Sequence, residues 1–129
     1  MKSTQPNSED TPSSQERALE DTLGYHVENE ALLETALTHP SYRNETGAPA
    51  DNQRLEFLGD ALIGFLLADR VFRHYTTKPE GMLTVLRASV VNGSALAAKA
   101  AKIGIGSALL LGQGEKTTGG RQRESNLAD

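Results

Sequence analysis

The chain has 129 residues, enough for one domain, of which 37% are apolar and 23% charged, and its net charge of −4 argues against a generic basic nucleic-acid binder. The absence of cysteine excludes disulfides, thiolate metal sites and cysteine nucleophiles. No apolar run reaches the roughly 18 residues of a membrane span, and the N-terminus has no hydrophobic stretch typical of a secretory signal, so we expect a cytoplasmic location.

The first predicted elements are a leader and a short helix. Residues 1–14 are rich in Ser, Thr, Pro and Asn, and we expect them to form a disordered leader. Ser13 and Glu16 have the spacing of a capping box, which predicts a helix from about residue 14 to residue 23. Gly24 is expected to end that helix.

A second helix and a loop follow. Asn29 can cap a helix in which apolar residues recur at helical spacing as far as Leu37. The dipeptide His39-Pro40 is expected to stop it, because proline disfavours the α conformation in the residue before it. Residues 43–51 are rich in turn-forming residues and are predicted to form a loop.

The third predicted helix is apolar almost all round. It starts near Asp51 or Asn52, either of which can cap it, and it runs to about His74. Because a helix without a polar face is normally buried, we expect it to lie in the centre of the domain.

The remaining sequence predicts further helices and no sheet. Pro79 suits the first turn of a fourth helix, whose apolar stripe fades near Lys102. The segment after it is irregular and glycine-rich, and residues 121–129 have the pattern of another helix beginning. No segment alternates convincingly as a strand does, so the sequence predicts an all-α fold.

Two acids interrupt the apolar third helix. Glu56 and Asp60 are one turn apart on the same face, where two like charges repel and a buried unpaired carboxylate is costly. Either a basic side chain covers them, or a hard divalent cation such as Mg²⁺ binds between them. The basic side chains considered for this role are Arg54, Arg87 and Arg121. Gly59, between the acids, predicts close approach of another backbone, from a neighbouring helix or from a partner subunit.

Five segments resemble, in order and spacing, the catalytic domain of bacterial ribonuclease III, with RLEFLGD as that family's signature. They are ALTHPSY (36–42), QRLEFLGDALIGFLLA (53–68), EGMLTVLRASVVNGSALA (80–97), LLLGQGEKTTGGRQRES (109–125) and NLAD (126–129). The resemblance implies an enzyme of that all-α fold, a Mg²⁺-dependent endoribonuclease in which Mn²⁺ can substitute. It implies cleavage of double-stranded RNA in rRNA, mRNA and tRNA precursors, leaving 5′-phosphate and 3′-hydroxyl ends, and a homodimer.

The resemblance also implies site residues. Glu56, Asp60 and Asp129 match metal-binding acids of the family, and Asp60 matches its essential catalytic acid. Glu80 falls in a segment associated with the active site, and Phe57 matches an aromatic residue of the dimer interface. Carboxylate-held Mg²⁺ can activate water and neutralise phosphoryl charge without a histidine base, so His26, His39 and His74 are predicted to be non-catalytic, with His39 structural near a helix end.

Basic residues gather in the second half of the chain. Residues 70–129 carry 9 basic and 4 acidic side chains, whereas residues 1–69 carry 4 basic and 13 acidic ones. The half with basic excess is a candidate phosphate-facing surface, with Lys116, Arg121 and Arg123 as predicted RNA-binding residues. Chance clustering on a solvated surface is the alternative explanation.

The sequence departs from the family pattern at two places. Position 53 is Gln where many relatives have Glu, and the family's remaining essential glutamate lies three residues beyond the position of Asp129. We therefore expect residues 15–129 to be a partial catalytic domain, without its closing helix and double-stranded-RNA-binding domain, and inactive alone. The alternatives are a non-catalytic RNA- or partner-binding module of the same fold, and an unrelated helical bundle with an ion-paired core.

Overall fold

The structure is a computed structural model and describes residues 13–129. The leader predicted for residues 1–14 lies outside the described residues as far as residue 12. Ser13 and Ser14 do not belong to a leader, because they cap and begin the first helix.

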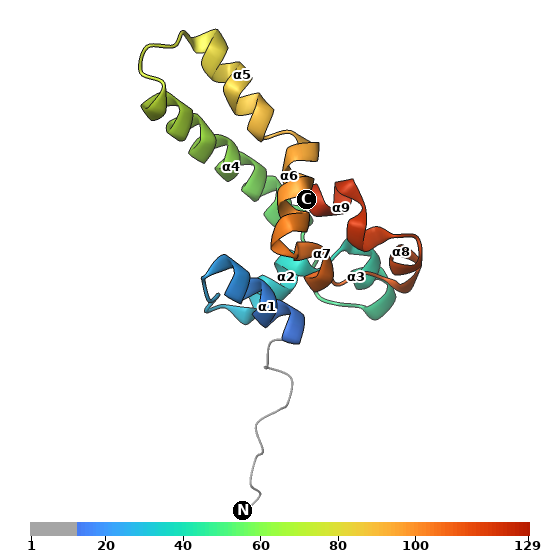
Figure 1. The fold of residues 1–129 in the computed structure, drawn as a ribbon. Helices are drawn as coiled ribbons and strands as arrows, with labels where there is room; N and C mark the ends of the chain where they lie inside the picture. The colour runs from blue at the N-terminus through green and yellow to red at the C-terminus, as the bar shows by residue number, and fades with distance from the viewer. Residues whose placement is uncertain (1–12) are drawn as a thin grey trace, which may run out of the picture.

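The described residues form helices joined by short connections (Figure 1). The helices are α1 (Ser14–Leu23), α2 (Glu30–Leu37), α3 (Pro40–Thr46), α4 (Gln53–His74), α5 (Glu80–Val90), α6 (Gly93–Ile103), α7 (Ile105–Ala108), α8 (Gln113–Thr117), the 3₁₀ helix η1 (Gly120–Gln122) and α9 (Glu124–Ala128). The only β contact within residues 13–129 is an isolated parallel bridge between Thr38 and Leu110. The prediction of an all-α fold is confirmed.

Local capping signals predicted the first two helices well. Ser13 and Glu16 form the expected capping box, and Gly24 ends α1 with a left-handed φ of 65°. The Asn29 side chain accepts a hydrogen bond from the Leu32 backbone N–H at 3.1 Å and so caps α2. These boundaries depend on residues a few positions apart, which is why sequence alone located them.

The loop predicted for residues 43–51 is partly wrong, because α3 extends through its first four residues. Pro40 ends α2, as expected, but it also occupies the first turn of α3, where its missing N–H has no intrahelical partner to lose. The His39 Nδ1 accepts a hydrogen bond from the Ser41 backbone N–H at 3.1 Å and caps this helix. The structural role predicted for His39 is therefore confirmed.

The predicted fourth helix is two helices, α5 and α6, that meet at a 45° bend. The break lies at Asn92, whose side-chain oxygen accepts a hydrogen bond from the Ala95 backbone N–H at 2.9 Å and starts α6. Pro79 precedes α5 as its N-cap and is not in its first turn. The apolar stripe continues through the break, so periodicity did not reveal it.

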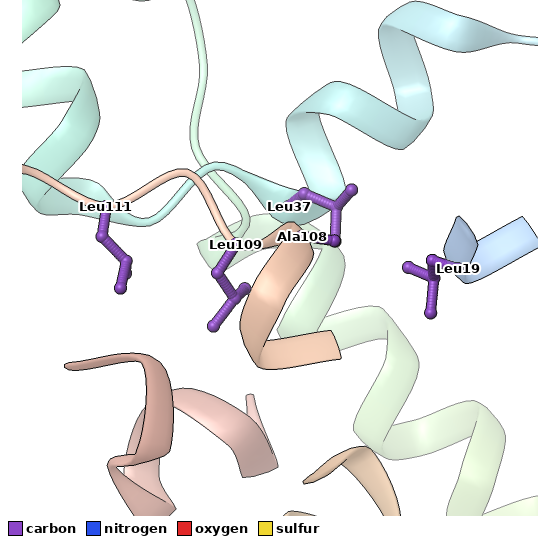
Figure 2. Packing of buried hydrophobic residues seen from close by; sticks show 5 residues of the cluster. All are labelled: Leu19, Leu37, Ala108, Leu109 and Leu111. Carbon is purple, nitrogen blue, oxygen red and sulfur yellow. The ribbon is translucent and has the colours of Figure 1, made fainter. Parts of the chain in front are cut away.

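The core lies where the first and last thirds of the chain meet. One cluster of buried side chains comes from α1, the end of α2 and the segment around α7: Leu19, Leu37, Ala108, Leu109 and Leu111 (Figure 2). A second cluster joins α6 to α9 through Ala97, Ala100 and Leu127. These clusters fix α9 against α6 and α7, and α2 against α7.

The α4–α5 hairpin projects from this core (Figure 1), so the central position predicted for the third helix is wrong. No residue of α4 is buried within the described chain, and Phe57 is 81% exposed. A Cβ placed on Gly59 would meet no atom within 4 Å, so the close approach predicted there does not come from within the described residues. An apolar pattern on all sides of a helix predicts that it is buried. It does not predict whether the same domain or a partner subunit buries it.

No single helix among the described residues is long and apolar enough to cross a membrane; only α5 and α6 taken together, across their 45° bend, meet that criterion of length and composition.

Candidate metal-binding site

Glu56, Asp60 and Asp129 line one pocket of about 170 Å³. The first two side chains come from the first turns of α4, and the third follows α9. Asn52, immediately before α4, lies in the wall of the same pocket. The structure therefore brings together the three acids that sequence analysis had assigned to a metal site.

The start of α4 is anchored to the end of α2, which fixes the position of the two α4 acids. The Asn52 backbone N–H donates to the Thr38 carbonyl at 2.9 Å, and Thr38 is 2% exposed. Asp51 Oδ1 accepts a hydrogen bond from the Gln53 backbone N–H at 3.2 Å, so Asp51 supplies the side-chain cap that Asn52 does not. Both sequence candidates for the cap therefore contribute, one through its side chain and one through its position.

The three carboxylates interact unfavourably with one another. Desolvation raises the pKa of Glu56 first of all, and the carboxylates of Asp129 and Asp60 raise it further. Desolvation and Asp60 likewise raise the pKa of Asp129, while nearby His39 opposes that rise. Glu56 is half-buried and Asp60 is exposed, so the pair is less buried than sequence analysis assumed. The pocket is thus a site of unbalanced negative charge.

The part of the chain that the structure describes offers these acids no ion-pair partner. Among residues 13–129, none of the ion pairs includes Glu56, Asp60 or Asp129. The Arg121 guanidinium instead donates to the carbonyls of Gly106 and Leu109, both at 2.9 Å. Arg87 lines a different, largely apolar pocket between α4 and α5. The structure therefore gives no support to a covering arginine from either of these positions.

The donor chemistry of the pocket fits a hard divalent cation. Glu56, Asp60, Asp129 and Asn52 line one small space, and carboxylate and amide oxygens suit Mg²⁺, which also keeps several of its waters. The carboxylates do not converge on one point: no group of three or more His, Asp or Glu side chains in the described part of the chain is close enough together to enclose an ion directly. Bridging water, or rotation of the side chains, would have to complete the coordination.

The other predicted site residues lie elsewhere. Glu80 begins α5 and lines the α4–α5 pocket with Arg87, so it does not belong to the acidic pocket. Lys116 is exposed on α8, and Arg123 pairs with Glu115. Arg121 is half-buried, and its donors serve the carbonyls at the end of α7.

Sequence reasoning missed Asn52 as a pocket residue and His39 as a neighbour of Asp129. Asn52 was recognised only as a helix cap, which is its ordinary role before an apolar helix. His39 was recognised only as a structural residue. No local signal places either beside Asp129, because that proximity depends on how α9 docks.

A family model described as "Ribonuclease-III-like" matches residues 29–129. A protein named Ribonuclease 3 from Syntrophomonas wolfei is 51% identical over 114 residues, which cover 88% of this chain and 48% of the relative. Ribonuclease 3 of Streptomyces coelicolor is 48% identical over 120 residues, covering 93% of this chain and 43% of the relative. The chain thus spans about half the length of these curated relatives.

Solved structures give the same result for the fold. The crystal structure of the nuclease domain of ribonuclease III from Campylobacter jejuni matches with a TM-score of 0.79 and 34% identity, over 87% of this chain and 74% of that one. A second structure of that domain, described as showing structural flexibility in the region involved in dimer formation, matches with a TM-score of 0.80 and 34% identity, over 86% and 75% of the two chains.

Proposed function

Since the chain belongs to the ribonuclease-III-like family, we propose that it provides the metal-binding carboxylates of a Mg²⁺-dependent endoribonuclease that cleaves double-stranded RNA. The observation that carries this proposal is the single pocket lined by Glu56, Asp60 and Asp129. Its relatives carry the name Ribonuclease 3, which supports the reaction class. A non-catalytic module would gain nothing from three mutually repelling carboxylates.

The chemistry assigns different tasks to the three acids. A cation bound there would activate water and neutralise charge that builds on the phosphoryl oxygens. Glu56, half-buried and with a raised pKa, would hold the cation from inside the pocket. Asp60 is exposed in the wall of the pocket, and it would bind the cation and orient the attacking water. Asp129 would close the site from α9, and hydrolysis would leave 5′-phosphate and 3′-hydroxyl ends.

We predict that Mg²⁺ reverses the stability ranking of the unaltered chain and Glu56→Gln. The raised pKa of Glu56 favours its protonated form in the folded state, so this group's contribution to stability is lost as pH rises through that pKa. At neutral pH without metal, Glu56→Gln should unfold at a higher temperature, by the equivalent of roughly 0.2–0.5 kcal/mol for relief of like-charge repulsion. Millimolar Mg²⁺ should stabilise the unaltered chain more than the variant.

Thermal unfolding at pH 7.5, with EDTA and with Mg²⁺, measures this reversal. At pH 4 the two chains should differ less, because protons replace the cation. If Mg²⁺ and Mn²⁺ leave the unfolding temperature of the unaltered chain unchanged, the metal site is wrong. A parallel binding assay with double- and single-stranded RNA tests the substrate class. The expectation that these 129 residues do not cleave alone stays a prediction for a cleavage assay of the same chain.

We further propose a homodimer that uses the exposed apolar face of the α4–α5 hairpin. The large side chains exposed on these two helices are Phe57, Leu58, Leu62, Ile63, Phe65, Leu66, Phe72, Met82, Val85 and Val90. Exposed apolar patches of this kind mark interaction sites. One of the similar nuclease-domain structures is described as having a region involved in dimer formation.

We expect Phe57→Ala to weaken self-association at least about tenfold, because exposed aromatics at interface centres contribute most of the binding energy. Sedimentation velocity over a concentration series measures the dimer dissociation constant. Tyr25→Ala removes an aromatic residue that is 67% exposed but lies outside the hairpin, and it should leave the constant unchanged. Equal effects of the two substitutions would contradict the assigned face.

The remaining parts of the proposal concern the RNA contacts and the location in the cell. Of the three predicted RNA-binding residues, Lys116 is exposed and forms no ion pair within the described residues. Arg123 forms an ion pair with Glu115, and Arg121 donates hydrogen bonds to backbone carbonyls. We therefore propose Lys116 as the strongest phosphate contact of the three. Processing of rRNA, mRNA and tRNA precursors and a cytoplasmic location follow from the proposed enzyme class.

A further inference from the structure

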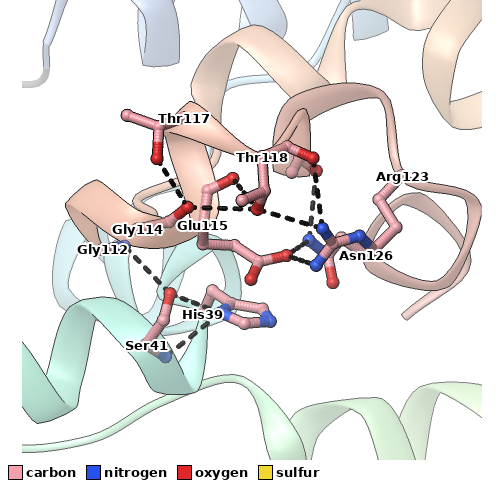
Figure 3. Close-up of polar contacts among 10 residues, drawn as sticks. His39, Ser41, Gly112, Gly114, Glu115, Thr117, Thr118, Arg123 and Asn126 are labelled. Carbon is pink, nitrogen blue, oxygen red and sulfur yellow. Dashed lines mark hydrogen bonds and ion pairs between the residues drawn. The ribbon is translucent and has the colours of Figure 1, made fainter.

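A polar network centred on Glu115 lies behind the acidic pocket. Glu115 Oε1 accepts a hydrogen bond from the Asn126 side-chain amide at 2.8 Å and pairs with the Arg123 guanidinium (Figure 3). The same Asn126 amide also donates to the Gly120 carbonyl at 3.0 Å, and Asn126 is buried. The Asn126 hydrogen bond, with Arg123, lowers the pKa of Glu115, so its carboxylate stays charged. The Glu115 carboxylate thus joins α8 to α9 and to Arg123, and Asn126 extends the network to η1.

The network holds the helix that ends at Asp129. Among the described residues, no hydrogen bond joins α9 to α4, although Asp129 shares a pocket with the α4 acids. The polar side-chain ties of α9 run elsewhere: Asn126 to Glu115 and Gly120, and Glu124 to the Ser94 hydroxyl at 2.6 Å. The distance of Asp129 from the other acids therefore depends on contacts made on the far side of α9.

Hydrogen bonds together with neighbouring residues along the backbone connect the start of α8 to the start of α4. At the beginning of α8, the Gly112 backbone N–H donates to Ser41 Oγ at 2.9 Å, and Ser41 Oγ lies 2.7 Å from His39 Nδ1. The bridge between Thr38 and Leu110 lies beside these contacts, and the Thr38 carbonyl accepts the Asn52 N–H. The α4 side of the acidic pocket and the segment that leads to α8 are therefore both hydrogen-bonded to residues 38–41.

The hydrogen bonds also orient the His39 ring. Its Nδ1 accepts from the Ser41 N–H at 3.1 Å and lies 2.7 Å from Ser41 Oγ, so this edge of the ring is held at the start of α3. The ring lies beside the Glu115 carboxylate (Figure 3), and its charge interactions reach both Glu115 and Asp129. His39 is therefore one of the residues that connect α8 to the acidic pocket.

We propose that Glu115, acting through Asn126 and Arg123, is a positioning residue that sets Asp129 against Glu56 and Asp60 for cation binding. This inference rests on the proposed function. Glu115 lines no part of the pocket and is not a cation ligand. Without its carboxylate, the buried Asn126 amide loses an acceptor and Arg123 loses its partner, so α9 can shift relative to α4.

A double-mutant cycle measured with Mn²⁺ as the probe tests this assignment. Calorimetric titration of the 129-residue chain compares the unaltered protein, Glu115→Ala, Asp129→Asn and the double variant. We expect Glu115→Ala to weaken Mn²⁺ binding about tenfold, the lower end of the cost of losing a group that supports a ligand. In the Asp129→Asn background the same substitution should have almost no further effect, because the group that it positions is absent.

Two further variants separate positioning from loss of stability. Glu115→Gln keeps an oxygen that can accept from Asn126 and should retain most of the affinity; it carries the test if Glu115→Ala does not fold. Glu20→Gln is the control, since Glu20 is buried and its carboxylate also accepts a hydrogen bond, from the Val27 N–H at 2.7 Å, but it lies on α1. It should lower the unfolding temperature without changing Mn²⁺ affinity.

The possible failures are distinguishable. If Asp129→Asn binds Mn²⁺ as tightly as the unaltered chain, the proposed metal site itself is wrong. If Asp129→Asn weakens binding but both Glu115 variants bind normally, only the positioning role is overturned. A full additional loss from Glu115→Ala in the Asp129→Asn background, or an equal loss from Glu20→Gln, overturns it as well.

Discussion

Asp60→Asn is expected to weaken divalent-cation binding by about a hundredfold or more, while the chain stays folded. Loss of a group that merely supports a metal ligand costs about 10–100-fold, and Asp60 is predicted to be a ligand itself. Asp60 is exposed, and its side chain makes no hydrogen bond or ion pair within the described residues. An amide of the same shape should therefore leave the free energy of unfolding nearly unchanged.

Calorimetric Mn²⁺ titration measures the loss of affinity in the 129-residue chain, and thermal unfolding measures its stability. Asp69→Asn is the matched control. Asp69 lies on the same helix but outside the acidic pocket, and it pairs with Arg73 at 2.8 Å. Unchanged Mn²⁺ affinity in Asp60→Asn, or an equal loss in Asp69→Asn, would contradict the assignment.

Gly106→Ala is expected to destabilise the chain by about 1–3 kcal/mol, the cost of forcing an extra group into a packed site. A Cβ on Gly106 would collide with the Arg121 backbone carbonyl oxygen and would lie 3.3 Å from the Leu127 side chain. Backbone cannot move aside as a flexible side chain can. The Arg121 guanidinium also donates to the Gly106 carbonyl, so a shift would disturb the contact between α7 and η1.

Gly64→Ala is the control, and it is expected to raise the free energy of unfolding where Gly106→Ala lowers it. No atom lies within 4 Å of a Cβ built on Gly64, which is in the interior of α4. Alanine there should stabilise the chain by up to about 1 kcal/mol, the difference between the two residues in a helix. Urea unfolding of both variants gives the two free energies. A Gly106→Ala chain as stable as the unaltered one would show that η1 does not pack closely on α7.

The sequence predicted local features more reliably than long-range ones. The ends of α1 followed from Ser13, Glu16 and Gly24, which lie within or next to the helix that they bound. The start of α3 was missed because Pro40 was interpreted only as a stop, although proline is equally suited to a first turn. The break at Asn92 was missed because the apolar pattern runs through it.

The same difference applies to the candidate site. Glu56 and Asp60 were found from their spacing on one helix, whereas Asp129 was assigned only through the family resemblance. Nothing in the composition of the segment before Asp129 indicates that Asn126 is buried against Glu115. Such contacts between segments follow from tertiary packing, and a periodic pattern contains no information on them.

The acidic pocket joins residues that are far apart along the chain, so a cation bound by both α4 and Asp129 would act as a cross-link. In an unfolded chain, bringing those residues together carries a loop-closure entropy that grows only slowly with the length between them. In the folded chain those residues are already together, so no further loop-closure entropy is lost on binding. A cation that binds only the folded state therefore shifts the folding equilibrium towards that state. The ion that serves the chemistry would then also hold the two halves of the fold together, and a chelator would loosen them.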